Sequence, residues 1–409
     1  MGTKTHSVMG DALENPFRPG AGHMPPHLAG RDQERAEFKR LLAQGTILEN
    51  LVLTGLRGVG KTVLLDTFKP LAISEGWMWV GTDLSESASV SETSLALRLL
   101  TDLSVVSSSM VVAEQPAAGF AAAPTDVTLT FQVLSSLYER TPGLVADKLK
   151  AVLEVVAGAV AAESKRGVIF AYDEAQNLAD ATDRDQFPLS LLLDVFQSLQ
   201  RKNIPFMLVL TGLPTLFPKL VEARTFAERM FRVVTLDKLS EEASREAIIR
   251  PIQKANCPVQ FDEISVVTVC RESGGYPYFI QFICREVYDV FIQQIEVQGE
   301  PSAVPLDAIT RKLDSDFFAG RWARATDRQR DLLFAIANLN TSHEEFTVQE
   351  IVAKGEAILP KPFSSSHVSQ MLASLQSVGL IYKNRWGKYS FAVPLFDRFI
   401  LRQYEALSA

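Results

Sequence analysis

The chain has 409 residues, of which 47% are hydrophobic and 22% are charged, and its formal net charge is −7. This length is typical of two or three domains, and the apolar content is enough to bury their cores, which excludes a disordered chain. The acidic balance excludes a protein that coats nucleic acid over its whole surface, although it leaves room for a local basic patch. The three cysteines are far apart in sequence, which disfavours a disulfide framework or a zinc site and fits a reducing compartment.

The N-terminal segment 1–27 is rich in Pro, Gly and His and has no hydrophobic periodicity, so we expect an extended arm there. It lacks the apolar stretch that a signal peptide needs. The longest run of small apolar residues, 151–162, is too short to span a bilayer and contains Glu154. We therefore expect a cytoplasmic protein that does not contact membranes.

Residues 28–238 alternate predicted helices with predicted strands. Apolar runs predict strands at 51–54, 77–82, 168–172, 206–210 and 232–236. Helical spacing of apolar residues predicts helices at 31–43, 95–103, 142–164 and 189–202. This alternation is typical of a doubly wound α/β fold with a parallel sheet. The Ser-, Ala- and Pro-rich stretch 104–130 interrupts the pattern, and we expect it to be an insertion or a mobile loop.

The pattern changes after residue 238, where the strands stop. Helices are predicted at 241–254, 263–272 and 276–294, followed by another helix beyond 305, so we expect 239–322 to be all-helical. In the last part of the chain, helices at 327–337, 348–353 and 365–378 precede strands at 380–383 and 389–392. Three helices followed by a hairpin is the order of a winged helix. Phe317, Phe318 and Trp322 recur at helical spacing, and we expect them to pack in a core or hinge rather than to bind a ligand.

A glycine-rich loop separates the first predicted strand from the next helix. It fits the pattern G-x-x-x-x-G-K-[ST] with Gly55, Leu56, Arg57, Gly58, Val59, Gly60, Lys61 and Thr62. The glycines let the backbone turn tightly and point its N–H groups at phosphate oxygens. The phosphates then lie at the N-terminus of the next helix, whose first turn includes Val63. Lys61 is expected to reach the β- and γ-phosphates, and the Thr62 hydroxyl to bind Mg²⁺. The loop therefore predicts a nucleotide site, with a chance glycine turn as the alternative.

The second half of such a site is an acid at the end of another buried strand. Asp173 and Glu174 follow the predicted strand 168–172. We expect Asp173 to hold Mg²⁺, mostly through water, and Glu174 to polarise the attacking water. Thr211 ends the next strand, where it either senses the γ-phosphate or only caps the strand end.

Arg229 and Arg232 precede the last predicted strand. An arginine at this place can reach the phosphate of a nucleotide held by a neighbouring subunit and stabilise transition-state charge. We favour Arg229 for this role, and a surface or structural role is the alternative. The role in a neighbouring site implies at least a dimer, so the sequence leaves a homo-oligomer open.

At these residues the sequence resembles AAA+ ATPases of the clade that unites archaeal replication-initiator-type ATPases with the STAND signalling ATPases. Residues 15–17 followed by 28–34, which include Gly30 and Arg31, look like the adenine-side box of this clade. The loop 55–62, with Asp173 and Glu174, looks like the Walker A and Walker B motifs of the superfamily.

A further segment, 274–281, looks like the Gly-x-Pro signature of the helical lid, whose proline packs against the nucleotide in STAND proteins. The matching residue is Pro277. Replication initiators usually carry an arginine near this place as a second phosphate sensor. The proline therefore favours the STAND side of the clade over the replication initiators.

The resemblance implies an ATPase that uses ATP and Mg²⁺ as a molecular switch, with slow or partner-stimulated turnover. ATP would bind between the α/β core and the lid, and hydrolysis would release the lid and the winged helix from one arrangement. The implied order is an extended arm (1–27), an AAA+ nucleotide-binding core (28–238), a helical lid (239–322) and a winged helix (323–409).

The winged helix leaves the partner open. Its predicted recognition helix offers His367 and Gln370, which can read base edges, and its predicted wing carries Lys383, Arg385 and Lys388. Residues 326–409 nevertheless hold nine Lys and Arg against eight Asp and Glu, a weak footprint for DNA phosphates. We favour an unidentified protein partner. The alternative is a DNA-binding regulator, or a transposition- or replication-type loader in which ATP drives assembly on DNA.

Overall fold

The computed structural model describes residues 14–20, 22–114, 125–255, 259–298, 304–385 and 387–408. The chain divides into two compact units. The sheet unit comprises residues 31–55 and 61–236, and the helical unit comprises residues 1–30, 56–60 and 237–409. The phosphate-loop segment 56–60 therefore groups with the helical unit, although the residues on either side of it belong to the sheet unit.

The sheet unit is built on five parallel strands in the order β2-β5-β6-β1-β7. Their bounds are Asn50–Gly55 (β1), Trp77–Val80 (β2), Gly167–Tyr172 (β5), Phe206–Gly212 (β6) and Phe231–Leu236 (β7). Every residue of β1, β5 and β6 is buried, which explains why these segments read as continuous apolar runs. The predicted α/β fold with a parallel sheet is confirmed.

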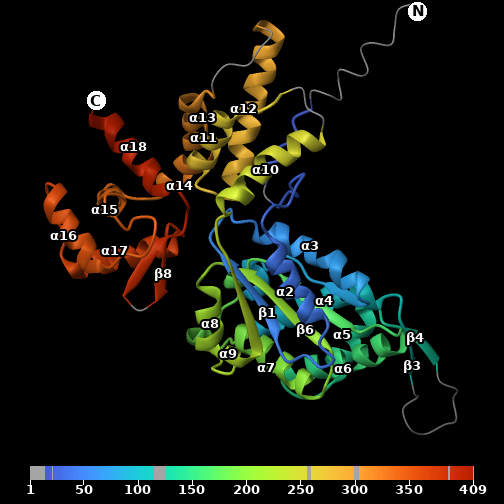
Figure 1. Ribbon diagram of the computed structural model, residues 1–409. Helices are drawn as coiled ribbons and strands as arrows, with labels where there is room; N and C mark the ends of the chain where they lie inside the picture. The colour runs from blue at the N-terminus through green and yellow to red at the C-terminus, as the bar shows by residue number, and fades with distance from the viewer. Residues whose placement is uncertain are drawn as a thin grey trace, which may run out of the picture. The chain divides into compact units, whose positions relative to one another are not determined.

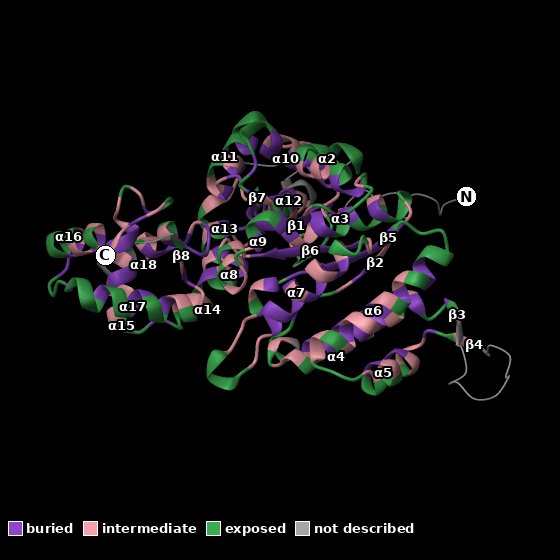
Figure 2. Ribbon diagram, turned by 90° about the horizontal axis from the view of Figure 1, so that it is seen from below, coloured by how far each residue is buried: buried purple, intermediate pink, exposed green. Residues whose placement is uncertain are grey.

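Helices cover both faces of this sheet (Figure 1). One face carries α2 (Asp32–Leu42) and α3 (Lys61–Ser74), and the opposite face carries α4 (Glu92–Ser107), α6 (Val145–Ala162) and α7 (Pro188–Arg201). Shorter helices are α5 (Phe131–Arg140), α8 (Leu216–Ala223) and α9 (Ala227–Met230), with 3-10 turns η1 (Glu86–Ser89), η2 (Ala175–Asn177) and η3 (Thr182–Arg184). Figure 2 shows the strands as a buried layer between half-exposed helices.

The stretch 104–130 differs from the predicted loop. Helix α4 extends to Ser107, and β3 (Val111–Glu114) pairs antiparallel with β4 (Thr125–Thr128). The pair of β-branched residues Val112 and Val127 stands directly across this ladder, which favours strand pairing. The hydroxyl of Ser107 donates to the carbonyl of Leu129 at 2.7 Å. Residues 115–124, the middle of the predicted loop, lie outside the described residues.

The helical unit begins with four helices and a π-helical turn. They are α10 (Glu241–Lys254), α11 (Glu263–Ser273), α12 (Pro277–Gln298), α13 (Leu306–Leu313) and the π turn η4 (Asp314–Phe318). The short α14 (Ala319–Trp322) follows. The C-terminal part then consists of α15 (Asp327–Ala337), α16 (Val348–Ile358), α17 (Ser365–Ser377), β8 (Ile381–Arg385), β9 (Lys388–Phe391) and α18 (Phe396–Ser408).

Local sequence signals set the helix starts of this unit. Five helices begin after a residue whose side chain accepts a backbone N–H of the first turn: Ser240, Asp262, Thr326, Thr347 and Ser364. Strands β8 and β9 pair antiparallel, so the C-terminal part has three helices followed by a hairpin, in the predicted order. Helix α18 follows the hairpin and was not predicted.

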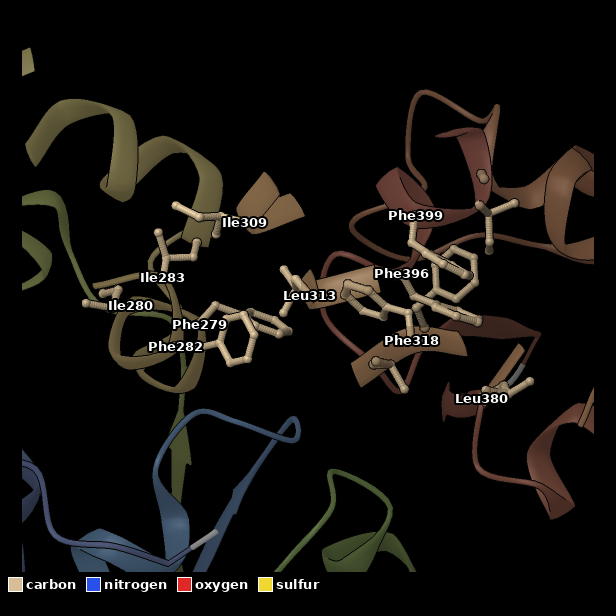
Figure 3. Close-up of a cluster of buried hydrophobic side chains, with 14 of the residues drawn as sticks. Phe279, Ile280, Phe282, Ile283, Ile309, Leu313, Phe318, Leu380, Phe396 and Phe399 are labelled. Atoms are coloured by element: carbon tan, nitrogen blue, oxygen red, sulfur yellow. The ribbon is translucent and has the colours of Figure 1, made fainter. Parts of the chain in front are cut away.

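One hydrophobic core joins the helices of this unit. It extends from α10 through α12 and η4 to α18, and Figure 3 shows its central aromatic side chains. Phe318 of η4 is fully buried and its ring stacks on that of Phe399 at 5.2 Å between centroids. The predicted packing role of Phe317 and Phe318 is confirmed, since their rings also lie 5.0 Å apart.

The described part of the predicted N-terminal arm, 14–20 and 22–27, has no helix or strand and packs on this unit. Phe17 is buried in its core, and the Asn15 amide donates to the Asp289 carboxylate at 2.7 Å. Residues 1–13 lie outside the described residues.

Among the described residues, no helix has both the length and the apolar character needed to cross a bilayer.

Candidate functional site

The phosphate loop leaves β1 at Gly55 and enters α3 at Lys61. Gly58 and Gly60 have φ angles of 80° and 91°, in the left-handed region that glycine enters at no steric cost. The Lys61 side chain is buried, and its Nζ donates to the carbonyl of Gly55 at 3.0 Å. The ammonium group therefore lies beside the first residue of the loop. Thr62 follows in the first turn of α3.

The Asp173 carboxylate is the centre of the sheet unit's polar cluster. The hydroxyl of Thr62 donates to its Oδ2, and the hydroxyl of Thr211 donates to its Oδ1. The backbone N–H of Glu174 also donates to Oδ1, at 2.8 Å. Asp173 is 3% exposed, and Thr211 is fully buried.

The sheet order explains this meeting. Strand β6 lies between β5 and β1, so the carboxyl ends of the three strands reach the same edge. Asp173 directly follows β5, and Thr211 is the second-last residue of β6. Thr62 lies in the first turn of α3, which the loop after β1 leads into. The structure thus brings together three of the residues that the sequence singles out.

Glu174 has a backbone conformation that is uncommon for its residue type. Its φ and ψ are 51° and 33°, in the left-handed region, and its side chain is exposed. The amide of Gln176 donates to its Oε2. The other end of that amide, Oε1, accepts the backbone N–H of Leu213 at 3.1 Å. Gln176 was not predicted as a site residue, and the only sequence signal for it is its position two residues after Glu174.

Two further carboxylates lie near Asp173, and sequence reasoning missed both. Burial and then the charge of Asp173 raise the pKa of Asp66. Burial, then the charges of Asp173 and Glu174, raise the pKa of Asp83. Asp83 pairs with Asp173 in a parallel backbone bridge, because β2 ends beside β5.

This donor set fits a divalent magnesium ion. A threonine hydroxyl oxygen and a carboxylate oxygen lie next to each other at the start of a helix, and hard oxygen donors are what Mg²⁺ prefers. Desolvation and then repulsion from Asp173 raise the pKa of Asp66 and Asp83, and a bound cation would relieve the repulsion. Over the described residues, no cluster of three or more His, Cys, Asp or Glu has the arrangement of a metal cage built from protein groups alone.

The middle of the phosphate loop makes its contacts in the helical unit. The carbonyl of Gly58 accepts the backbone N–H of Tyr278 at 3.2 Å, and a Cβ on Gly58 would lie 3.2 Å from that of Tyr278. The Arg57 guanidinium lies within 4 Å of where a Cβ on Gly379 would stand, just after α17. Val59 is buried.

Pro277 opens α12, the position where a helix tolerates proline because that N–H needs no partner. Gly274 caps the preceding helix with φ 58°, and Gly275 has φ 78°. The carbonyl of Gly275 accepts the N–H of Leu239 at 2.8 Å. The predicted Gly-x-Pro signature is thus a tight turn between α11 and α12, and Tyr278, which touches the phosphate loop, comes directly after it.

Gly30 and Arg31 lie before α2. Gly30 has φ 63°, and a Cβ there would come within 2.7 Å of the Ala243 side chain, so both conformation and space call for glycine. Arg31 is 6% exposed and its guanidinium pairs with Glu34 at 3.2 Å.

Arg229 and Arg232 differ in their surroundings. Arg229 lies on the exposed side of α9 and is not part of the Asp173 cluster. Arg232 pairs with Glu37 of α2 at 2.7 Å, which supports the structural alternative for Arg232.

Residues 27–221 match the family described as AAA ATPase domain. The matched range includes the phosphate loop, Asp173, Glu174 and Thr211, while residues 315–400 match a domain of unknown function, DUF8462. No curated protein sequence matches the chain.

Two solved structures share the fold. The Walker-type ATPase PABY2304 of Pyrococcus abyssi is 17% identical, with a TM-score of 0.57, and the alignment covers 91% of this chain and 96% of that one. The ADP form of the ORC2 protein of Aeropyrum pernix is 13% identical, with a TM-score of 0.53, covering 95% and 99%. At these identities the similarity concerns the fold.

The acidic surroundings of Asp173 predict that Asp83→Asn raises the thermal denaturation midpoint at pH 7 without magnesium. A carboxyl whose pKa is raised on folding costs stability above its folded pKa, and the cost disappears once the pH falls below its unfolded pKa. The gain should therefore shrink as the pH is lowered toward 4. Asp183→Asn is the control, since Asp183 is also exposed but is not bridged to Asp173 as Asp83 is. A lower midpoint for Asp83→Asn at pH 7 would contradict the electrostatic argument.

Proposed function

We propose that this protein is an Mg-ATP-binding ATPase that acts as a molecular switch. Its nucleotide state would reposition the helical lid (239–322) and the winged helix (323–409), and so regulate a partner. The observation that carries the proposal is that the hydroxyls of Thr62 and Thr211 both donate to the buried Asp173 carboxylate. The glycine-rich loop lies next to Thr62, and the Lys61 ammonium donates to its first residue, Gly55. The AAA ATPase domain match over 27–221 supports it.

The loop 55–62 would bind the phosphates through its backbone N–H groups and the N-terminus of α3. Lys61 would exchange its bond to the Gly55 carbonyl for the β- and γ-phosphate oxygens, so the ammonium stays paired in both states. Thr62 and Asp173 would hold Mg²⁺. When bound, this ion neutralises negative charge on the phosphate oxygens. On the adenine side, the resemblance points to Gly30, Arg31 and Pro277.

Hydrolysis would use Glu174 as the general base. A water oxygen forms a bond to the γ-phosphorus, the bond between that phosphorus and the ADP oxygen breaks, and a water proton passes to the Glu174 carboxylate. Thr211 would sense the γ-phosphate through the Asp173 carboxylate that it shares with Thr62. The exposed Arg229 would complete the site of a neighbouring copy, in a homo-oligomer.

The switch rests on contacts of the phosphate loop inside the helical unit. Gly58 bonds to Tyr278, whose ring lies 5.1 Å from that of Phe317. Phe317 and Phe318 belong to the π turn η4, and Phe318 packs on Phe396 and Phe399 of α18 (Figure 3). A loop that changes conformation with its nucleotide would therefore push on a packed aromatic row that ends at the C-terminal helix.

A protein partner fits the C-terminal part better than DNA does. The exposed first turns of α17 present Ser365, Ser366, His367, Ser369 and Gln370, without a cation among them. DNA is the second candidate, because these same side chains are exposed and their polar groups can read base edges.

The site assignment predicts that Lys61→Ala binds ATP about tenfold to a hundredfold more weakly, since a hydrogen bond to a charged group is lost. Glu174→Gln should keep nucleotide but lower turnover by about 10²- to 10⁴-fold, the usual contribution of a general base. Fluorescence titration and phosphate release measure the two effects. Lys69→Ala, exposed on the same helix, is the control, and wild-type affinity in Lys61→Ala would refute the site.

The switch predicts a difference in hydrogen exchange at α18 between the protein with an unreactive ATP analogue and with ADP. Phe317→Ala should remove that difference while changing nucleotide affinity less, because it interrupts the aromatic row without touching the loop. Phe334→Ala is the matched control, since Phe334 is also half-buried and stacks on Tyr404 of α18 at 3.9 Å without contacting Tyr278. If Phe317→Ala leaves the difference in place, or if Phe334→Ala removes it to the same extent, the row is not the route.

The choice of a protein partner predicts that duplex DNA does not stimulate phosphate release, and that any residual DNA binding varies little with salt. Each phosphate contact would contribute a slope of about −0.9 in log K against log salt. Stimulated release together with a steep slope, both lost on replacing Lys383 and Lys388 by Ala, would establish the DNA-binding alternative instead.

A further inference from the structure

The Gln176 side chain bridges two functional segments of the sheet unit. Its Nε2 donates to Oε2 of Glu174, and its Oε1 accepts the backbone N–H of Leu213 at 3.1 Å. Leu213 follows the end of β6, two residues after Thr211. One amide therefore connects the proposed general base to the strand end that carries the proposed γ-phosphate sensor.

The orientation of this amide is fixed by its partners. A backbone N–H can only donate, so Leu213 must face the amide oxygen of Gln176. The amide nitrogen then faces Glu174, whose carboxylate oxygen Oε2 accepts its hydrogen bond. Exchanging the amide oxygen and nitrogen would break both hydrogen bonds at once. The two contacts therefore allow only one orientation of the Gln176 amide.

The backbone around Gln176 is held as firmly as its side chain. Its carbonyl accepts a hydrogen bond from Nζ of Lys219 at 2.7 Å, from helix α8. The preceding residue, Ala175, is buried. A Cβ on Gly212 would come within 2.5 Å of the Gln176 Oε1, so glycine is what leaves room for the amide.

Glu174 needs such a support. Its side chain is exposed and would otherwise sample several rotamers, while a general base must stand within hydrogen-bond reach of its water. A catalytic group that is misplaced by about 1 Å can lower the reaction rate about a hundredfold.

We propose that Gln176 is a positioning residue that holds the Glu174 carboxylate in register with the end of β6. A movement of Thr211 and Leu213 would then move Glu174 with it, so the state of the γ-phosphate would reach the general base through one side chain. This inference rests on the proposed ATPase function.

Two variants separate the two bonds. Gln176→Ala loses both, whereas Gln176→Glu keeps an acceptor for Leu213 but replaces the donor that faces Glu174 by an oxygen. We expect each to lower kcat by about tenfold or more, with KM and the affinity for an unreactive ATP analogue within about twofold of wild type. Hydrogen exchange at the Leu213 amide should accelerate in Gln176→Ala and stay protected in Gln176→Glu.

Two comparisons distinguish positioning from a general structural role. Asn177→Ala, on the same turn but bonded to Leu84, should leave kcat unchanged within about twofold. In a Glu174→Gln background, Gln176→Ala should cause no further loss, because Gln176 acts only through Glu174.

Wild-type kcat in both Gln176 variants, or full additivity with Glu174→Gln, would overturn the inference. Its failure is distinguishable from that of the proposed function. If the function itself is wrong, Lys61→Ala keeps its affinity or Glu174→Gln keeps its turnover. If only the inference is wrong, those two variants behave as expected while the Gln176 variants resemble wild type.

Discussion

The hydrogen bonding of the Asp173 carboxylate is the constraint on which the rest of the site depends. Taking a carboxylate out of water is costly unless its oxygens are satisfied, and here two hydroxyls and a backbone N–H supply the donors. Thr211 lies near the carboxyl end of β6, and the other two donors come from segments that follow the adjacent strands β1 and β5. The sheet order is therefore what makes the burial tolerable. The same bonds hold Thr62 and Thr211 where a magnesium ion and a γ-phosphate would be recognised.

The phosphate loop links this chemistry to the helical unit. Its ends belong to the sheet unit, whereas Gly58 hydrogen-bonds to Tyr278 and Arg57 lies beside Gly379, both in the helical unit. Burial of Arg321 lowers the pKa of its guanidinium, and the charge of Arg57 lowers that pKa further. The Arg321 guanidinium lies 4.1 Å from the centre of the Phe317 ring. A loop surrounded in this way cannot change shape without disturbing its neighbours, because protein interiors are closely packed.

The π turn η4 is placed where such a disturbance would be passed on. Phe318 packs on α18, and the Arg402 Nε of α18 donates to the Asp314 carboxylate at 3.0 Å. A π turn gives up the regular hydrogen bonds of an α-helix, and packing must offset that loss. Such turns are frequent at functional positions. In the sheet unit, Gln176 has the comparable role, with one amide joined to two segments.

The sequence alone predicts the α/β core, the phosphate loop and the acids after the buried strand. These predictions are possible because apolar runs and glycine spacing are local properties of the sequence. It also placed Thr211 at a strand end, although not in contact with Asp173. Only the tertiary structure decided that Arg232 pairs with Glu37, that Tyr278 contacts Gly58, and that Gln176 joins Glu174 to Leu213. The pairing of β3 with β4 and helix α18 were also not predicted. These features depend on contacts between segments far apart in the chain, and such pairing leaves no periodic signal in the sequence.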